Sequence, residues 1–76
     1  MEVESMKLLA AALCMSVGVI TPAIAEGMIA GKAMEAMGRN PEAGNAMFPR
    51  MIVGLAIVES LAIYCLVIAL IILFAA

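Results

Sequence analysis

A carboxylate inside an apolar run is the residue of this chain best placed to do chemistry. Glu59 lies within the run from Met51 to Phe74, in which nearly every residue is apolar or small. About 20 such residues are enough to span the hydrocarbon core of a bilayer. A carboxylate near the centre of a span costs at least about 2.5 kcal/mol on insertion scales. An acidic residue kept inside a membrane span in spite of this cost indicates ion binding, proton relay or substrate capture.

Glu26 is a second acid in an apolar stretch, and it lies as many residues before the midpoint of the polar loop as Glu59 lies after it. Because helical residues rise at a constant rate, a hairpin would bring the two carboxylates to a similar depth. If they face each other, both cannot be ionised without a cation between them. We therefore expect them to titrate as one coupled unit.

Further oxygens lie near Glu59. Ser60 follows it directly, and Tyr64 comes about one helical turn later. The carbonyl of Val58 would contribute if the helix loosens there. Two carboxylates, a hydroxyl and a carbonyl form either an oxygen cage for a small hard cation or a hydrogen-bond network that holds a proton. In the alternative reading, the Ser60 hydroxyl bonds back to its own helix and Tyr64 is an aromatic packing group.

The composition indicates that lipid, and not water, surrounds this chain. The 76 residues are 67% hydrophobic and 13% charged, and the mean hydropathy is +1.22. So short a chain can bury little core, and so few charges cannot cover a water-exposed surface; lipid must act as solvent. The net charge of −2 gives no basic patch for nucleic acid, and the absence of His excludes imidazole chemistry. Cys14 and Cys65 lack motif spacing and are expected to pack as small apolar residues.

The first 25 residues also resemble a signal peptide, with an apolar stretch over 8–20 and Ala-Ile-Ala at 23–25. Two features oppose cleavage. Glu2 and Glu4 make the start acidic, and the apolar pattern continues to Met37. We expect this segment to remain as a membrane helix.

The sequence predicts an all-α membrane protein, a single transmembrane hairpin. We expect helix 1 over about 5–37, a polar loop over about 38–45 and helix 2 over about 46–75. Pro22 removes a backbone hydrogen bond and predicts a mild kink. Gly44 or Asn45 is expected to cap the second helix.

The distribution of basic residues predicts which side of the membrane the loop faces. Lys32, Arg39 and Arg50 lie in or near the loop, whereas the terminal side carries only Lys7. By the positive-inside rule the loop is cytoplasmic and both termini are outside. Lys32 and Glu35 are expected either to form a solvated pair at that interface or to snorkel toward it.

Small residues mark two faces of helix 1. Thr21 and Ala25 share one face, while Ala23, Gly27 and Gly31 share another. Small residues at four-residue spacing let membrane helices approach closely. A dimer needs one such face, but a closed ring needs two because its interfaces are heterologous. The pattern predicts a homo-oligomeric ring; the alternative is a membrane helix that is merely rich in Ala and Gly.

These residues resemble the proteolipid, or c-ring protein, of rotary F-type ATP synthases over nearly the whole chain. The resemblance rests on the small-residue repeat from Thr21 to Gly27, the loop Arg39-Asn40-Pro41-Glu42 and the segment from Val58 to Tyr64. Each motif is modest alone, but the three in this order and spacing are highly specific.

The resemblance implies a ring of identical hairpins in a bacterial plasma membrane, with helix 1 inside and helix 2 outside. Glu59 would take an ion from one half-channel of stator subunit a, carry it through lipid and release it through the other. Arg39, Asn40 and Pro41 would dock the central-stalk subunits gamma and epsilon. The hairpin would perform no bond chemistry and would need no cofactor besides the transported ion.

The resemblance leaves two ions open. Sodium-type members pair an acid or amide on helix 1 with Glu-Ser-Thr and a Tyr; Glu26, Ser60 and Tyr64 match, but Leu61 replaces the Thr. We therefore expect H+, with Na+ as the alternative. Sodium, if carried, would be bound by Glu59, Glu26, Ser60 and Val58.

Two other classes of protein use similar features. A small proton-coupled multidrug exporter has a membrane glutamate, but 4% aromatic residues make a poor substrate pocket. A holin-like pore former would explain the small-residue faces but not two carboxylates at one depth. Both remain remote alternatives.

Overall fold

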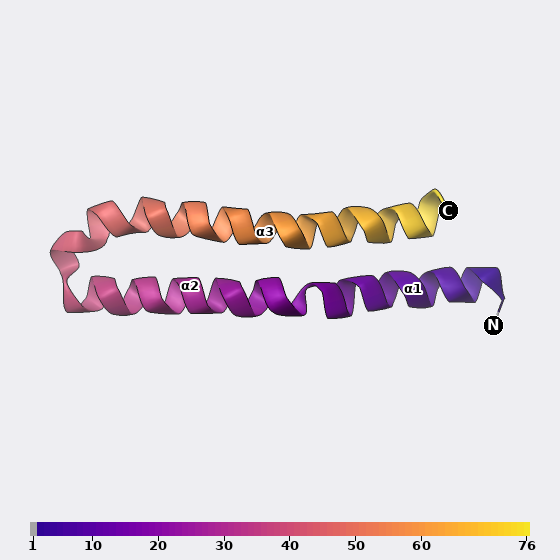
Figure 1. The fold of residues 1–76 in the computed structure, drawn as a ribbon, viewed down its shortest axis with the longest axis horizontal. Coiled ribbons are helices and arrows are strands. Elements are labelled where there is room, and N and C mark those ends of the chain that lie inside the picture. Colours follow the sequence, from indigo (N-terminus) through magenta and orange to yellow (C-terminus); the bar gives the residue numbers. More distant parts are fainter. Residues whose placement is uncertain (1) are drawn as a thin grey trace.

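The computed structural model describes residues 2–76, which form an antiparallel helical hairpin (Figure 1). The first arm contains α1 (Val3–Gly18) and α2 (Ile20–Arg39), and the second contains η1 (Pro41–Ala43) and α3 (Gly44–Phe74). No strand occurs in residues 2–76. Both arms, Val3–Arg39 and Pro41–Phe74, are long and apolar enough to cross a membrane. The expected all-α hairpin is confirmed.

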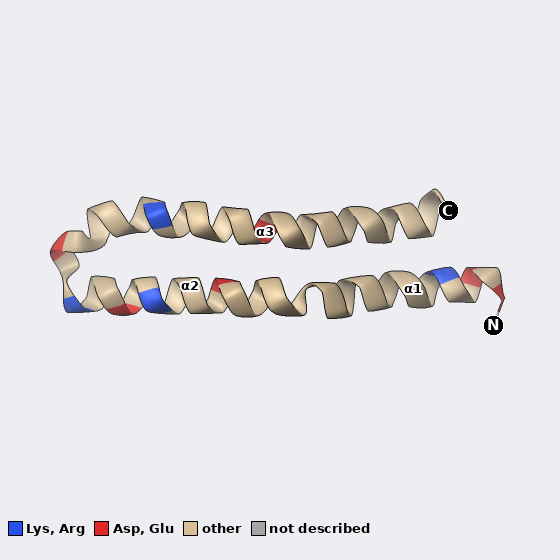
Figure 2. Ribbon diagram, in the orientation of Figure 1, with Lys and Arg blue, Asp and Glu red and all other residues tan. Residues whose placement is uncertain are grey.

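The hairpin is longer than a bilayer core is thick. It extends 58 Å along its longest axis, whereas the hydrocarbon core measures about 30 Å. The ends of both helices must therefore reach into the interfaces. Figure 2 shows most charged residues toward the loop and the N-terminus, which are the parts expected to meet water and headgroups.

Helix 1 is distorted at one residue, Val19, which lies one turn before Pro22 and keeps right-handed helical backbone angles. α1 ends at Gly18 and α2 begins at Ile20, so the break at Val19 divides the expected single helix. Pro22 has no N–H to donate to the carbonyl four residues earlier, at Gly18, and its ring crowds that carbonyl. The interruption therefore falls one turn before the proline, and helical bonding resumes where the Ala23 N–H donates to the Val19 carbonyl at 3.0 Å.

The connection between the arms is shorter than expected. α2 continues to Arg39 and leaves Asn40 as the link to η1, because the residue before a proline disfavours helical geometry. Pro41 then starts a 3₁₀ turn that runs directly into α3. The N-cap of α3 is Ala43, which makes no side-chain capping bond. The predicted cap at Gly44 or Asn45 is wrong because the preceding turn is already helical.

Glu35 pairs with a different basic residue than predicted. Its carboxylate lies 3.8 Å from the Arg39 guanidinium, one turn further along α2, and not against Lys32. Both side chains of the pair are largely exposed. An exposed pair at this spacing contributes only a few tenths of a kcal/mol.

Small residues form the seam between the arms. The buried apolar residues are Ala11, Ala33 and Ala69, joined by Pro22, and no large side chain among the described residues is fully buried. Large apolar residues such as Ile57 (66% exposed) and Leu8 (64%) point outward instead. This inverted arrangement fits a chain that packs through small side chains and presents large ones to lipid.

The two arms approach closely at Gly18. A Cβ added there would lie 2.6 Å from Cys65 Sγ, and nearby the Cys14 thiol donates to the Cys65 carbonyl at 3.4 Å. Both cysteines are free thiols that are partly buried in the seam. They pack as small residues between the helices.

This contact gives a first prediction. We expect Gly18→Ala to destabilise the hairpin by roughly 1–3 kcal/mol, the usual cost of overpacking, and Gly18→Ala/Cys65→Ala to recover most of the loss because the clashing sulfur is gone. Unfolding in mixed micelles with increasing SDS, followed by circular dichroism, measures both. Equal instability of the single and double variants would contradict the contact.

Candidate ion-binding site

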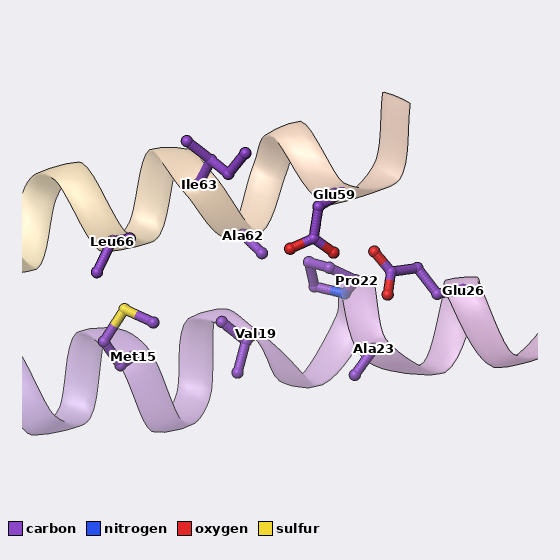
Figure 3. Close-up of a pocket in the computed structure, with 9 residues that line it drawn as sticks. All are labelled: Met15, Val19, Pro22, Ala23, Glu26, Glu59, Ala62, Ile63 and Leu66. Carbon is purple, nitrogen blue, oxygen red and sulfur yellow. The ribbon is translucent and has the colours of Figure 1, made fainter. Parts of the chain in front are cut away.

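The structure brings Glu26 of α2 and Glu59 of α3 to one pocket, as the hairpin geometry predicts. The pocket has a volume of about 280 Å³. In Figure 3 the two carboxyl groups point toward each other across the space between the helices. The other residues that line it are apolar: Met15, Val19, Pro22, Ala23, Ala62, Ile63 and Leu66.

The environment of Glu26 calls for a further partner. Its Oε1 atom is buried and has no hydrogen-bond partner among the described residues, while the neighbouring Glu59 carboxyl is of like charge when ionised. An unsatisfied buried oxygen costs about 1–3 kcal/mol, and more when it is charged. Glu59 itself is exposed in the single hairpin, but two ionised carboxylates face each other stably only when a proton or a cation lies between them.

Local helix geometry places these side chains. Met15, Val19, Pro22 and Glu26 follow one another at three- or four-residue spacing, which puts them on one side of the first arm. Val19 is also the residue at which the arm is interrupted. The pocket therefore lies at the level of the helix break.

The apolar lining is the part of the site that sequence reasoning missed. On α3, Ala62, Ile63 and Leu66 lie one or two turns beyond Glu59, on the terminal side. Their helical spacing from the acid is the signal that would have identified them. The carboxyl pair thus lies at one end of an apolar pocket.

The other predicted oxygen donors do not line this pocket. The Ser60 hydroxyl donates to the Ile57 carbonyl of its own helix, which is the alternative geometry anticipated above. Tyr64 is 67% exposed, and neither Tyr64 nor the half-buried Val58 lines the pocket. Within one chain, only the two carboxylates meet.

The predicted ring-packing residues lie mostly on the outside of the hairpin. Thr21, Ala23, Gly27 and Gly31 are exposed and Ala25 is half-buried. A Cβ added at Gly27 or Gly31 would meet nothing within 4 Å. Their lack of a side chain is therefore not required for packing within a single hairpin.

The predicted stalk contacts lie together at the tip. Arg39 is the last residue of α2, Asn40 is the link and Pro41 begins η1. All three are exposed. The tip is therefore free to meet another protein.

The paired carboxyl groups give a second prediction. Two interacting acids release their protons in two macroscopic steps, so we expect Glu26→Gln to convert a two-step carboxyl titration into a single step. Infrared difference spectroscopy of the carboxyl C=O band, measured against pH, would follow it. Glu42→Gln is a matched control in the exposed loop; an unchanged two-step titration in Glu26→Gln would show that the acids are not coupled.

Comparison with known proteins gives a consistent result. The family model for the C subunit of ATP synthase matches residues 9–72. The ATP synthase c-type subunit of Dehalococcoides mccartyi is 46% identical over 76 residues, which is all of both chains. The second such protein of Cereibacter sphaeroides is 47% identical over 73 residues, covering 96% of this chain and 88% of the relative.

A third relative, the corresponding ATP synthase protein of Petrotoga mobilis, is 46% identical over 68 residues. The match covers 90% of this chain and 71% of the relative. The matched residues 9–72 include most of both arms, the loop and both intramembrane acids. With its two apolar helices, the protein is an integral membrane hairpin, and it belongs to the family of ATP synthase C subunits.

Proposed function

We propose that this hairpin is the rotor subunit of a rotary ATP synthase and that Glu59 carries the coupling ion. The observation that supports it most directly is the meeting of Glu59 with Glu26 in one pocket, within a member of the ATP synthase C family. With Glu26 protonated, one proton or cation is enough to neutralise the Glu59 carboxylate inside an apolar span, and Glu59 releases that ion when the surroundings become polar.

The physics of the bilayer explains how such a group rectifies motion. A carboxylate that passes through lipid must be neutral, either protonated or paired with a cation. It becomes ionised only in the aqueous half-channels that stator subunit a would supply. A membrane potential of 100 mV supplies about 2.3 kcal/mol for each charge that crosses, which drives the ring and the attached stalk.

The ring follows from the exposed small-residue faces. Gly27 and Gly31 are open within one hairpin, and small residues of this kind let a neighbouring helix approach closely. Helix 1 would face the inside of the ring and helix 2 the outside. The tip would contact gamma and epsilon on the cytoplasmic side of a bacterial plasma membrane, and both termini would be outside.

We propose H+ as the coupling ion. A sodium ion needs several well-placed oxygens, whereas the pocket of one chain holds only the carboxyl groups of Glu26 and Glu59. The Ser60 hydroxyl donates within its own helix, and Leu61 has no oxygen to add. A carboxyl group that takes up a proton is neutral and needs no further ligand.

Carbodiimide labelling tests the proposed ion. The reagent reacts with the protonated carboxyl of Glu59, so labelling should depend on pH in the same way with and without sodium. Potassium chloride at equal ionic strength is the control. Protection by sodium but not by potassium near neutral pH would replace H+ with Na+ and leave the rotor role intact.

A further inference from the structure

The Thr21 hydroxyl is a polar group of the membrane span that finds no partner in the hairpin. Within residues 2–76, side-chain hydrogen bonds are donated by Ser5, Cys14 and Ser60, and none involves Thr21. Thr21 is the central residue of the first arm, Val3–Arg39, and it is exposed in the single hairpin. The hydrocarbon core holds no water to satisfy such a group. The hydroxyl therefore calls for a partner outside its own chain.

The seam between the arms determines which way Thr21 faces. Pro22 is buried in that seam, and successive residues of a helix are about 100° apart. Thr21 and Ala23 therefore lie on opposite flanks of helix 1. In the proposed rotor ring, on which this inference rests, helix 1 is inside and helix 2 outside, so the seam points along the radius and the two flanks face the neighbouring copies. The Thr21 flank of one copy thus packs on the Ala23 flank of the next.

The Ala23 flank carries a backbone acceptor at the depth of Thr21. The Val19 carbonyl accepts the Ala23 N–H at 3.0 Å, so its oxygen lies on that flank, between the two residues. A carbonyl oxygen has two lone pairs, and this bond uses one of them. In parallel copies Thr21 is two residues from Val19, or about 3 Å along the axis. The carbonyl points toward the loop and the Thr21 side chain leans toward the N-terminus, which brings the two oxygens to nearly the same height.

The Ala23 flank is also small enough for close approach, and it borders the ion-binding pocket. Ala23 is exposed, and an added Cβ at Gly27, one turn later, would meet nothing within 4 Å. Small residues so spaced let a neighbouring helix come within hydrogen-bonding reach. Val19 and Ala23 line the pocket that holds Glu26 and Glu59 (Figure 3).

We propose that the Thr21 hydroxyl of each copy donates a hydrogen bond to the Val19 carbonyl of the next copy. The hydroxyl then gains the partner that its own hairpin lacks, and the carbonyl uses its second lone pair. Because Val19 is part of the pocket wall, each copy covers one side of its neighbour's ion-binding pocket. Donor and acceptor lie on opposite flanks of helix 1, as the heterologous interface of a closed ring requires.

Ring stability tests the energetic side of this proposal. Assembled rings of wild type, Thr21→Val and Thr21→Ser are incubated in SDS, and gel electrophoresis follows their dissociation into single chains. Valine has nearly the shape of threonine but no hydroxyl, whereas serine keeps the hydroxyl. We expect Thr21→Val to shorten the dissociation half-time at least about threefold, the fold-change that corresponds to one average hydrogen bond between membrane helices. Thr21→Ser should remain near wild type, and circular dichroism verifies that both variants keep their helices.

The chemical shift of the Val19 carbonyl identifies the acceptor. Only two Val-Ile pairs occur in the chain, Val19-Ile20 and Val67-Ile68. Rings that combine carbonyl-¹³C valine with ¹⁵N isoleucine therefore report on these two carbonyls alone in solid-state NMR, and Val67 on the other arm is an internal control. We expect Thr21→Val to move the Val19 signal upfield, because the carbonyl loses a donor, and to leave the Val67 signal unchanged. Thr21→Ser should keep the wild-type shift at Val19.

The outcomes separate this contact from the proposed function. Wild-type protein that forms no ring would overturn both the rotor role and the contact. Thr21→Val rings that keep the wild-type half-time and Val19 shift would overturn the contact and leave the rotor role intact. A shorter half-time without a change at Val19 would overturn the assignment of this carbonyl as acceptor. An equal Val19 change in single chains in detergent would show that the hydroxyl bonds within its own hairpin.

Discussion

Replacing Glu59 by Gln should abolish ATP-driven ion pumping and ion-driven ATP synthesis completely, while the ring still assembles. The amide has nearly the same shape as the protonated acid, so packing is preserved, but it cannot ionise in a polar channel. Without alternation between neutral and charged forms, the rotation of the ring has no preferred direction. Quenching of a pH-sensitive dye in inverted vesicles measures pumping, and native gel mobility measures assembly.

The control for this substitution is Glu42→Gln, which removes a carboxylate of the exposed loop and should leave pumping largely intact. Glu26→Gln should differ from both, because Glu59 remains able to carry an ion. We expect it to pump with an altered pH dependence. Full activity in Glu59→Gln would disprove the ion-carrying role of this residue.

The second large effect concerns assembly. We expect Gly27→Leu or Gly31→Leu to prevent ring formation while leaving the single hairpin folded. An added side chain at either glycine meets nothing within one chain, so the fold tolerates it. Between copies, overpacking costs roughly 1–3 kcal/mol, and a closed ring repeats that cost at every interface.

Native mass spectrometry of protein extracted in mild detergent measures the copy number, and circular dichroism measures the helix content. Ala46→Leu is a matched control, since it adds a large side chain at an exposed position of α3 and leaves both small-residue faces of helix 1 unchanged. Intact rings in both glycine variants would show that these faces do not form the interface.

The hairpin and its acid pair could be predicted because they depend on regular geometry. Constant helical rise places Glu26 and Glu59 at matched depth whatever the detailed packing, and the structure puts both in one pocket. The small seam residues likewise follow from the need for close approach in lipid.

Other features depended on choices between nearly equal local geometries. The distortion at Val19, one turn before Pro22, reflects how the chain relieves one crowded carbonyl. The Ser60 hydroxyl had a carbonyl of its own helix within reach, and it donates there. Glu35 had basic residues three positions before it and four after it, and it pairs with Arg39. Such alternatives differ by a few tenths of a kcal/mol, which residue types alone do not decide.

Tyr64 shows a second reason why the sequence does not predict the whole site. Its predicted role near the carboxylates requires a side chain that points toward them, but it is 67% exposed on the hairpin. A contact with the site of a neighbouring copy depends on the ring and not on the chain. Its part in ion binding stays a prediction, as does that of Val58.

The central claim is that Glu59 is the ion-carrying group, and the most direct test is to follow its modification and the loss of function together. Vesicles containing the assembled synthase are treated with carbodiimide, and at each time the modified residue is identified by mass spectrometry while ATP-driven pumping is measured. We expect a single adduct on Glu59 that appears at the same rate as pumping is lost, and no adduct on Glu42. Pumping that survives full modification of Glu59, or that is lost while Glu59 remains unmodified, would contradict the claim.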